Sequence, residues 1–242
     1  MVLAIHLYKR MMRKGRVISL LALSSVPALV ILLASIDEDP AEFATTYSNS
    51  IAGPGYTFAI AALILTVATL RDERDSGTLP YIYMRPISRV SLAISSVAAG
   101  AAAAVTIAIG AWLMTVLAGL AVGGDLSITL PGITLFVAAA IGYAALFVPL
   151  GYLVPRALLV GLGYIVVVES ILAAFVTGLA QFSIWRISLS IYAGIEDNLG
   201  DGVFETLGPV TPGVGGGIIK IAVAVVVGTA VLTLALKRRD AL

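Results

Sequence analysis

The chain alternates between long apolar runs and short polar segments, a pattern typical of helices that cross a membrane. Six runs stand out, at about residues 17–36, 51–70, 90–122, 133–154, 157–179 and 218–236. Each is close to or above the roughly 20 residues that a helix needs to cross a hydrocarbon core about 30 Å thick. The pattern therefore predicts an all-α integral membrane protein, with six transmembrane helices in one domain that covers residues 1–242.

Two of these runs carry features that predict their shape. Pro27 lies in the middle of the first run, where its missing amide donor is expected to kink the helix. The third run, 90–122, is too long for one untilted span. Its helix must therefore tilt or project into the cytoplasm.

The N-terminal residues 2–14 show a shorter, amphipathic pattern. One helical face would carry Leu3, Leu7, Tyr8 and Met11, and the opposite face His6, Lys9, Arg10, Arg13 and Lys14. A basic face opposite an apolar one suits a helix that lies in the membrane interface, against anionic lipid head groups. The alternative is a basic N-terminus that only fixes the topology of the first span.

The connections between the runs are uneven in length. Pro155 and Arg156 form a minimal inner turn, whereas residues 180–217 form the longest outer segment. Within this segment, residues 184–195 are moderately apolar and include tryptophan and tyrosine, which suits a short interfacial or re-entrant helix. The glycine-rich stretch 208–217 predicts a flexible start to the last span.

Composition and charge place the chain in a membrane and orient it. Hydrophobic residues make up 60% of the chain and charged residues only 12%, more apolar surface than a soluble domain of this size can bury. Of the 15 lysines and arginines, all but Arg186 and Lys220 lie on the inner side if both termini are cytoplasmic. This distribution predicts a multi-pass plasma-membrane protein with cytoplasmic N- and C-termini.

The segment 71–89, between the second and third runs, is dense in charge. Three of its residues can cap a helix N-terminus, namely Ser76, Thr78 and Ser88. It also contains two prolines, Pro80 and Pro86. A proline is tolerated in a first helical turn and stops a helix further on. The segment therefore predicts a helix of one to two turns at about residues 79–84, followed by Ser88 as the cap of the third span.

This segment resembles the coupling loop of the permease subunits of type-2 ABC exporters. The resemblance rests on Glu73 at the end of a membrane helix, then Gly77-Thr78-Leu79, then Arg85-Pro86-Ile87-Ser88-Arg89 before the next one. It implies a coupling helix that docks on a separate cytoplasmic ABC ATPase. It also implies an N-terminal interfacial helix, a helical hairpin in the outer loop, and a second permease copy, as a homodimer or a heterodimer.

The docking residues implied by the resemblance are Glu73, Gly77, Thr78, Leu79, Tyr81, Arg85, Pro86, Ile87, Ser88 and Arg89. A carboxylate at a helix C-terminus opposes the helix dipole, so Glu73 needs a cation from Arg74, Arg85, Arg89 or the ATPase. Tyr81 has the alternative role of an anchor among lipid head groups. The alternative for the whole segment is a solvated loop that only fixes topology.

Glu169 is the one ionisable residue deep within a predicted span. A buried carboxylate costs several kcal/mol unless it protonates, pairs or faces water. One hypothesis places Glu169 on a substrate path, in contact with a cationic or hydrogen-bonding group. The other makes it a neutral acid that hydrogen-bonds a neighbouring helix, with Ser170 as a possible contributor.

Catalytic and cofactor functions fit the sequence poorly. The chain has no cysteine and a single histidine, and it contains no G-x-x-x-x-G-K-[ST] phosphate loop. We therefore predict no metal, no cofactor, no catalytic residues and no nucleic-acid partner, with ATP hydrolysis on another chain. The predicted function is the permease of an ABC exporter in contact with membrane lipid. The alternatives are a proton-coupled carrier that uses Glu169 and a non-transporting membrane scaffold.

Overall fold

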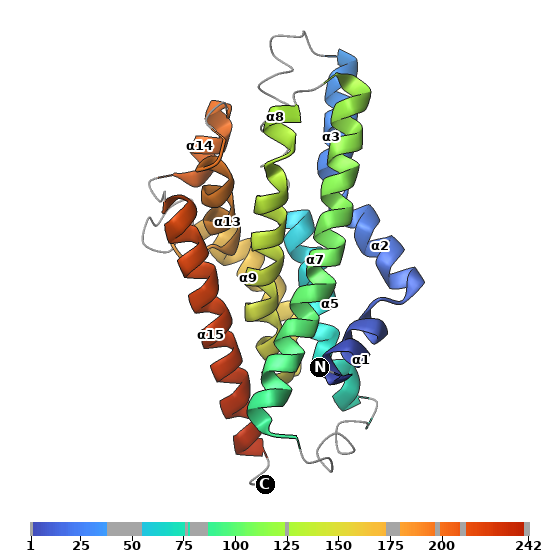
Figure 1. The fold of residues 1–242 in the computed structure, drawn as a ribbon, viewed down its shortest axis with the longest axis vertical. Coiled ribbons are helices and arrows are strands. Elements are labelled where there is room, and N and C mark those ends of the chain that lie inside the picture. Colours follow the sequence, from blue (N-terminus) through green and yellow to red (C-terminus); the bar gives the residue numbers. More distant parts are fainter. Residues whose placement is uncertain are drawn as a thin grey trace.

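The computed structural model describes residues 2–37, 55–75, 77, 87–123, 126–172, 180–196, 199–208 and 212–239. All secondary structure among these residues is helical, which agrees with the predicted all-α class. In chain order the helices are α1 (Val2–Met11), α2 (Lys14–Ser24), α3 (Val26–Asp37), α5 (Gly55–Asp75), α7 (Arg89–Val122), α8 (Leu126–Thr129), α9 (Gly132–Leu153), α10 (Ala157–Gly163), the π-helix η1 (Tyr164–Leu172), α13 (Ile184–Ala193), α14 (Asp201–Leu207) and α15 (Gly213–Arg239). Figure 1 shows them as an elongated bundle with α7, α9 and α15 running along its length.

Three helical stretches among the described residues are long and apolar enough to cross a membrane, namely Arg89–Val122, Leu126–Leu153 and Gly213–Arg238. The pair α2 and α3 makes a fourth if it is counted as one broken span. Residues 157–171 form a shorter apolar helix. Six spans therefore stay a prediction, since 51–54 and 173–179, in the second and fifth runs, lie outside the described residues.

The first predicted span is bent, as Pro27 indicated. Helices α2 and α3 meet at Ser25 with an angle of 42°. The hydroxyls of Ser24 and Ser25 each donate to the carbonyl four residues earlier, at 2.7 Å, a contact that often bends helices. Pro27 supplies no amide to the same turn. The bend thus has a local cause in the sequence.

Helix α9 is the centre of the bundle and packs against α5, α7, α13 and α15 (Figure 1). Its aromatic side chains are fully buried: Phe136 meets Phe58 edge-on at 5.6 Å, and Tyr143 stacks on Phe147 at 5.5 Å between ring centroids. Glycines let two neighbours approach closely. A Cβ on Gly151 would overlap the backbone of Val67 in α5, and a Cβ on Gly228 in α15 would overlap that of Ala145.

Helix α5 ends at Asp75, so Glu73 lies in its last turn. One predicted boundary was wrong. Helix α15 begins at Gly213, so residues 213–217 are helical rather than a flexible lead. The reason lies in packing, because a Cβ on Gly217 would lie 2.5 Å from Ile191 of α13. Glycine there allows the two helices to touch, which the composition of the stretch alone did not indicate.

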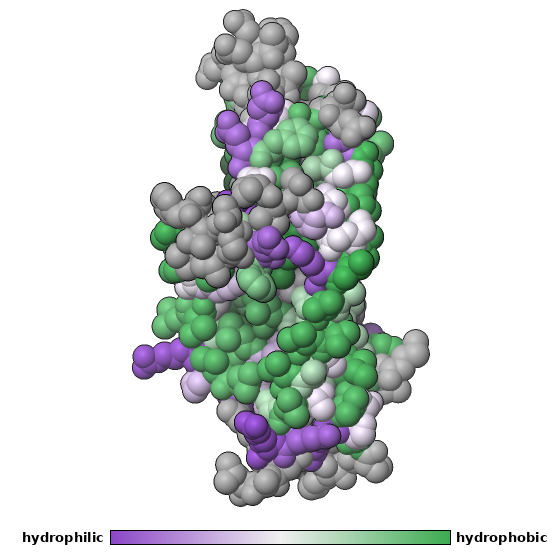
Figure 2. Space-filling view, turned by 90° about the vertical axis from the view of Figure 1, so that its left-hand side faces the viewer, coloured by the Kyte–Doolittle hydropathy of each residue, from purple (hydrophilic) through white to green (hydrophobic). Residues whose placement is uncertain are grey.

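The outer faces of the long helices are apolar. Exposed large side chains include Leu113, Leu117 and Leu120 on α7, and Val223, Val226 and Leu234 on α15. Figure 2 shows a broad hydrophobic surface over the lower middle of the molecule, with hydrophilic residues gathered below it at the end that carries the C-terminus. This distribution is that of a protein whose sides face lipid.

Gly151→Ala should destabilise the protein by about 1–3 kcal/mol, because the added methyl would overlap backbone that cannot rotate away. The measurement is thermal unfolding of the detergent-purified protein. Gly163→Ala is the matched control, since a Cβ at that position would have no neighbour within 4 Å. Equal losses in both variants would argue against close α9–α5 packing.

Candidate functional site

The C-terminal end of α5 carries an acidic side chain that is buried. Glu73 is 2% exposed, although it lies in the charged stretch that ends the helix. Its carboxylate Oε1 lies 2.5 Å from Nη1 of Arg10, and His6 Nε2 lies 3.9 Å from the same oxygen. The cation that Glu73 requires therefore comes from α1, and the partners proposed from the sequence did not include it.

A second ion pair contacts the same end of α5. Arg16 at the start of α2 pairs with Asp72, with 3.1 Å between Nη2 and Oδ2. Arg10 also donates from Nη2 to the backbone carbonyl of Asp72, at 3.1 Å. On the other side, Arg74 donates to the carbonyl of Tyr152 at the end of α9, at 3.2 Å. The end of α5 is thus held by α1, α2 and α9 together.

The face of α1 that carries Leu7 and Met11 packs against the bundle itself, a contact that the amphipathic pattern did not predict. Leu7 and Met11 are 1% and 2% exposed and pack with Leu65 of α5 and Ala103 of α7. Polar contacts at the edge join the same helices, since the hydroxyl groups of Tyr8 and Thr106 lie 3.1 Å apart. The helix covers Val2–Met11 and ends short of the predicted residue 14. Its position in the membrane interface stays a prediction.

The predicted coupling loop is described only at its ends. Gly77 has φ +68°, a left-handed conformation that suits glycine just after a helix, and its amide donates to the carbonyl of Arg74 at 3.1 Å. Ser88 caps α7 as predicted, accepting from the amide of Ser91 at 3.1 Å. Ile87 packs against a buried cluster that includes Leu70 and Leu92.

The remaining implied docking residues lie outside the described residues, together with the short helix expected at 79–84. They are Thr78, Leu79, Tyr81, Arg85 and Pro86. Arg89 is the first residue of α7. The structure therefore places Glu73, Ile87, Ser88 and Arg89 at or near the ends of α5 and α7, and the docking role of all ten residues stays a prediction.

Glu169 belongs to a separate cluster, at the level of α13. It is 3% exposed, and four donors of the chain lie within hydrogen-bond distance of its carboxylate. Tyr143 of α9 donates to Oε2 at 2.6 Å. The hydroxyl of Tyr164 lies 3.2 Å from Oε1 and 3.1 Å from the carbonyl of Phe182, and its one hydrogen is shared between these two acceptors. The backbone amides of Ile184 and Trp185, the first two residues of α13, also donate to Oε1, at 3.0 and 3.4 Å. The substrate-path role of Glu169 stays a prediction.

The sequence signalled that Glu169 was unusual but identified none of these donors. The hydroxyl of Ser170, considered as a contributor, donates instead to the carbonyl of Ile165 in its own helix, at 3.2 Å. The signal that could have been used is the pair of tyrosines in the fourth and fifth runs, since a buried phenol requires an acceptor.

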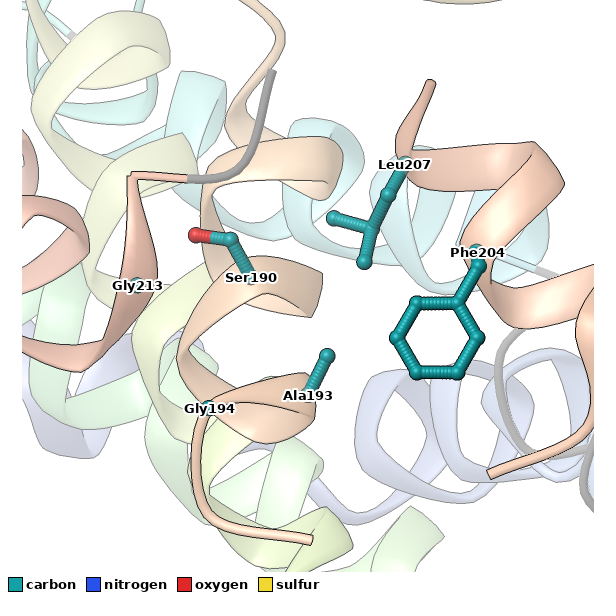
Figure 3. Close-up of a pocket in the computed structure, with 6 residues that line it drawn as sticks. All are labelled: Ser190, Ala193, Gly194, Phe204, Leu207 and Gly213. Atoms are coloured by element: carbon teal, nitrogen blue, oxygen red, sulfur yellow. The ribbon is translucent and has the colours of Figure 1, made fainter. Parts of the chain in front are cut away.

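A cavity of about 150 Å³ lies between α13, α14 and the start of α15. Figure 3 shows Phe204 and Leu207 of α14 on one side of the cavity and Ala193 of α13 on the other, with Ser190 also in the lining. The one side-chain hydroxyl in its lining, that of Ser190, already donates to the carbonyl of Ile187 at 2.7 Å. Apart from this hydroxyl, the lining is therefore apolar over the residues that the structure describes. Among the described residues, no group of three or more His, Cys, Asp or Glu side chains could hold a metal ion.

Comparison with known families gives one match that covers most of the chain. A family model described as "ABC-2 family transporter protein" matches residues 7–191. The matched region runs from within α1 to within α13 and therefore includes both clusters described above. Comparisons with curated proteins and with solved structures found no match.

Arg10→Ala should lower the free energy of unfolding by about 3 kcal/mol, because it leaves the buried Glu73 carboxylate without its nearest cation. The double variant Arg10→Ala/Glu73→Gln removes the stranded charge and should recover part of this loss. Lys9→Ala, an exposed neighbour, is the control for charge. Denaturant unfolding of the purified protein measures all three. A double variant less stable than Arg10→Ala would contradict the pairing.

Proposed function

The chain belongs to the ABC-2 transporter family and is an ABC transporter permease, and we propose that it is the membrane subunit of an exporter powered by a separate ATPase. The observation that carries the proposal is the set of ion pairs around Glu73 and Asp72 at the end of α5. There, charged side chains of α1 and α2 hold the end of α5 immediately before the predicted docking loop.

The contacts around Glu73 would transmit a movement of the loop 71–89 to the rest of the bundle. The end of α5 before the loop is held by Arg10, Arg16 and Arg74. The start of α7 after it is held by the Ser88 cap and by packing against α1. Helix α7 has 34 residues and runs most of the length of the bundle (Figure 1). A displacement of the loop by an ATPase would therefore move α1, α5 and α7 together and reach the outer side.

We propose two roles for the predicted docking residues. Glu73 is almost fully buried and held by Arg10, so we propose that it shapes the end of α5 from within. Ser88 and Ile87 likewise secure the start of α7. Direct contact with the ATPase would then fall to Gly77, Thr78, Leu79, Tyr81, Arg85, Pro86 and Arg89. Arginine and tyrosine are the side chains that most often dominate such interfaces.

We further propose the assembly and the orientation. Two permease copies would stand side by side, identical or different, with two ATPases beneath them and the substrate path between the bundles. The apolar outer faces of α7 and α15 are available for a second copy or for lipid. Six spans, cytoplasmic termini and a plasma-membrane location follow from the apolar runs and from the basic residues that gather on one side.

Co-purification of the tagged chain with its ATPase tests the proposal. Arg85→Ala/Arg89→Ala should reduce recovery of the ATPase at least about tenfold, since interface arginines often contribute more than 1 kcal/mol each. Arg13→Ala/Lys14→Ala removes the same charge from exposed positions and serves as the control. If the unaltered chain retains no ATPase under gentle extraction, the proposal fails. Docking without substrate flux would instead support the scaffold alternative.

The carrier alternative makes a different prediction about Glu169. Because four donors of the chain already occupy this carboxylate, we expect Glu169→Gln to leave the pH profile of ATP-dependent transport unchanged. The measurement is transport across vesicle membranes at several pH values, compared with and without added ATP. Transport that proceeds without ATP and loses its pH dependence in Glu169→Gln would support a proton-coupled carrier.

A further inference from the structure

We propose that Glu169 is a positioning residue that fixes the outer helix α13 against the π-helical part of the fifth predicted span. This role is independent of the ATPase and of the direction of transport. It rests on three observations: the cap that Glu169 provides, the π-helix that presents it, and the packing of α13.

Glu169 caps α13 from another helix. The first amides of a helix have no partner within it, and a negative group there also gains from the helix dipole. In α13 the side chain of the local cap, Ser183, accepts from the amide of Arg186, at 3.2 Å. Glu169 accepts from the amides of Ile184 and Trp185, the two residues before Arg186. Without Glu169, these two buried amides would lose the acceptor they have in this structure.

The π-helix brings the capping group into place. Tyr164 and Glu169 are five residues apart and share a hydrogen bond. Five residues of an α-helix turn through about 500°, which would leave the two side chains about 140° apart. A π-helix, with its i to i+5 hydrogen bonds, places them on one side. The π-helical form of η1 and the cap on α13 therefore depend on each other.

The packing of α13 shows what this cap controls. The helix lies between α9 and α15, both of which run through the bundle (Figure 1). A Cβ on Gly142 of α9 would lie 2.6 Å from Ile184, and a Cβ on Gly217 of α15 would lie 2.5 Å from Ile191. Because α13 contacts both helices this closely, a shift of its N-terminus would change the spacing of α9 and α15 in the outer half.

The same geometry argues against a cation site at Glu169. Its Oε2 accepts the phenol of Tyr143 and its Oε1 accepts three further donors. Tyr143 and the two amides present hydrogen atoms to the carboxylate, and Tyr164 shares its one hydrogen between Oε1 and the carbonyl of Phe182. The carboxylate therefore faces the positive ends of dipoles from α9 and from the start of α13. A substrate cation would have to displace the start of α13 to reach it.

Amide hydrogen exchange of the full chain in lipid nanodiscs, without ATPase, tests the proposal. Glu169→Ala should speed exchange in α13 about fivefold or more, the factor that corresponds to loss of a typical N-cap, and exchange in residues 164–172 should rise with it. Glu169→Gln keeps one acceptor oxygen and should fall between the alanine variant and the unaltered chain. Thr115→Ala is the control, because its buried hydroxyl bonds only to the carbonyl of Ala111 in its own helix among the bonds observed.

Unchanged exchange of α13 in Glu169→Ala, or an equal rise in Thr115→Ala, would overturn the proposal. So would a Glu169→Gln variant that exchanges as fast as Glu169→Ala. If Glu169→Ala does not fold, Tyr143→Phe decides the question, since it removes the shortest of the four bonds and leaves the carboxylate in place. It should speed exchange in α13 about twofold, and no change in α13 would again overturn the proposal.

Discussion

The absence of water within a lipid bilayer governs the rest of this structure. Each polar group that enters the apolar bundle must find its partner within the chain. Helices satisfy the backbone, and buried hydroxyls donate to the carbonyl four residues earlier in the same helix, as Ser24, Thr66, Ser96 and Thr115 do. What cannot be satisfied locally is satisfied between helices, and those contacts define the two clusters of this protein.

The two buried carboxylates show two solutions to the same problem. Glu73 lies near the C-terminus of α5, where the helix dipole disfavours negative charge, so it requires a full cation and receives one from Arg10. Glu169 faces the N-terminus of α13, where the dipole favours negative charge, and neutral donors are sufficient. The first solution ties the N-terminal helix to the end of α5. The second ties the outer helix to α9 and η1.

Between these clusters the bundle is continuous. Helix α9 connects them, because Tyr152 near its C-terminal end accepts from Arg74 through its carbonyl, and Tyr143 nearer its middle donates to Glu169. Close contacts at Gly151 and Gly228 join α9 to α5 and α15 along the way. One central helix therefore carries polar contacts to both clusters.

The sequence by itself determined the features that depend on neighbouring residues. Apolar runs and the amphipathic pattern of 2–14 predicted helices, Pro27 predicted a bend, and Ser88 was identified as a cap, because each of these effects acts within one or two helical turns. The pairing of Arg10 with Glu73, the donors around Glu169, the π-helix and the early start of α15 at Gly213 were decided only by tertiary structure. They depend on which side chains from distant parts of the chain meet in a medium without water, and local sequence patterns do not predict such contacts.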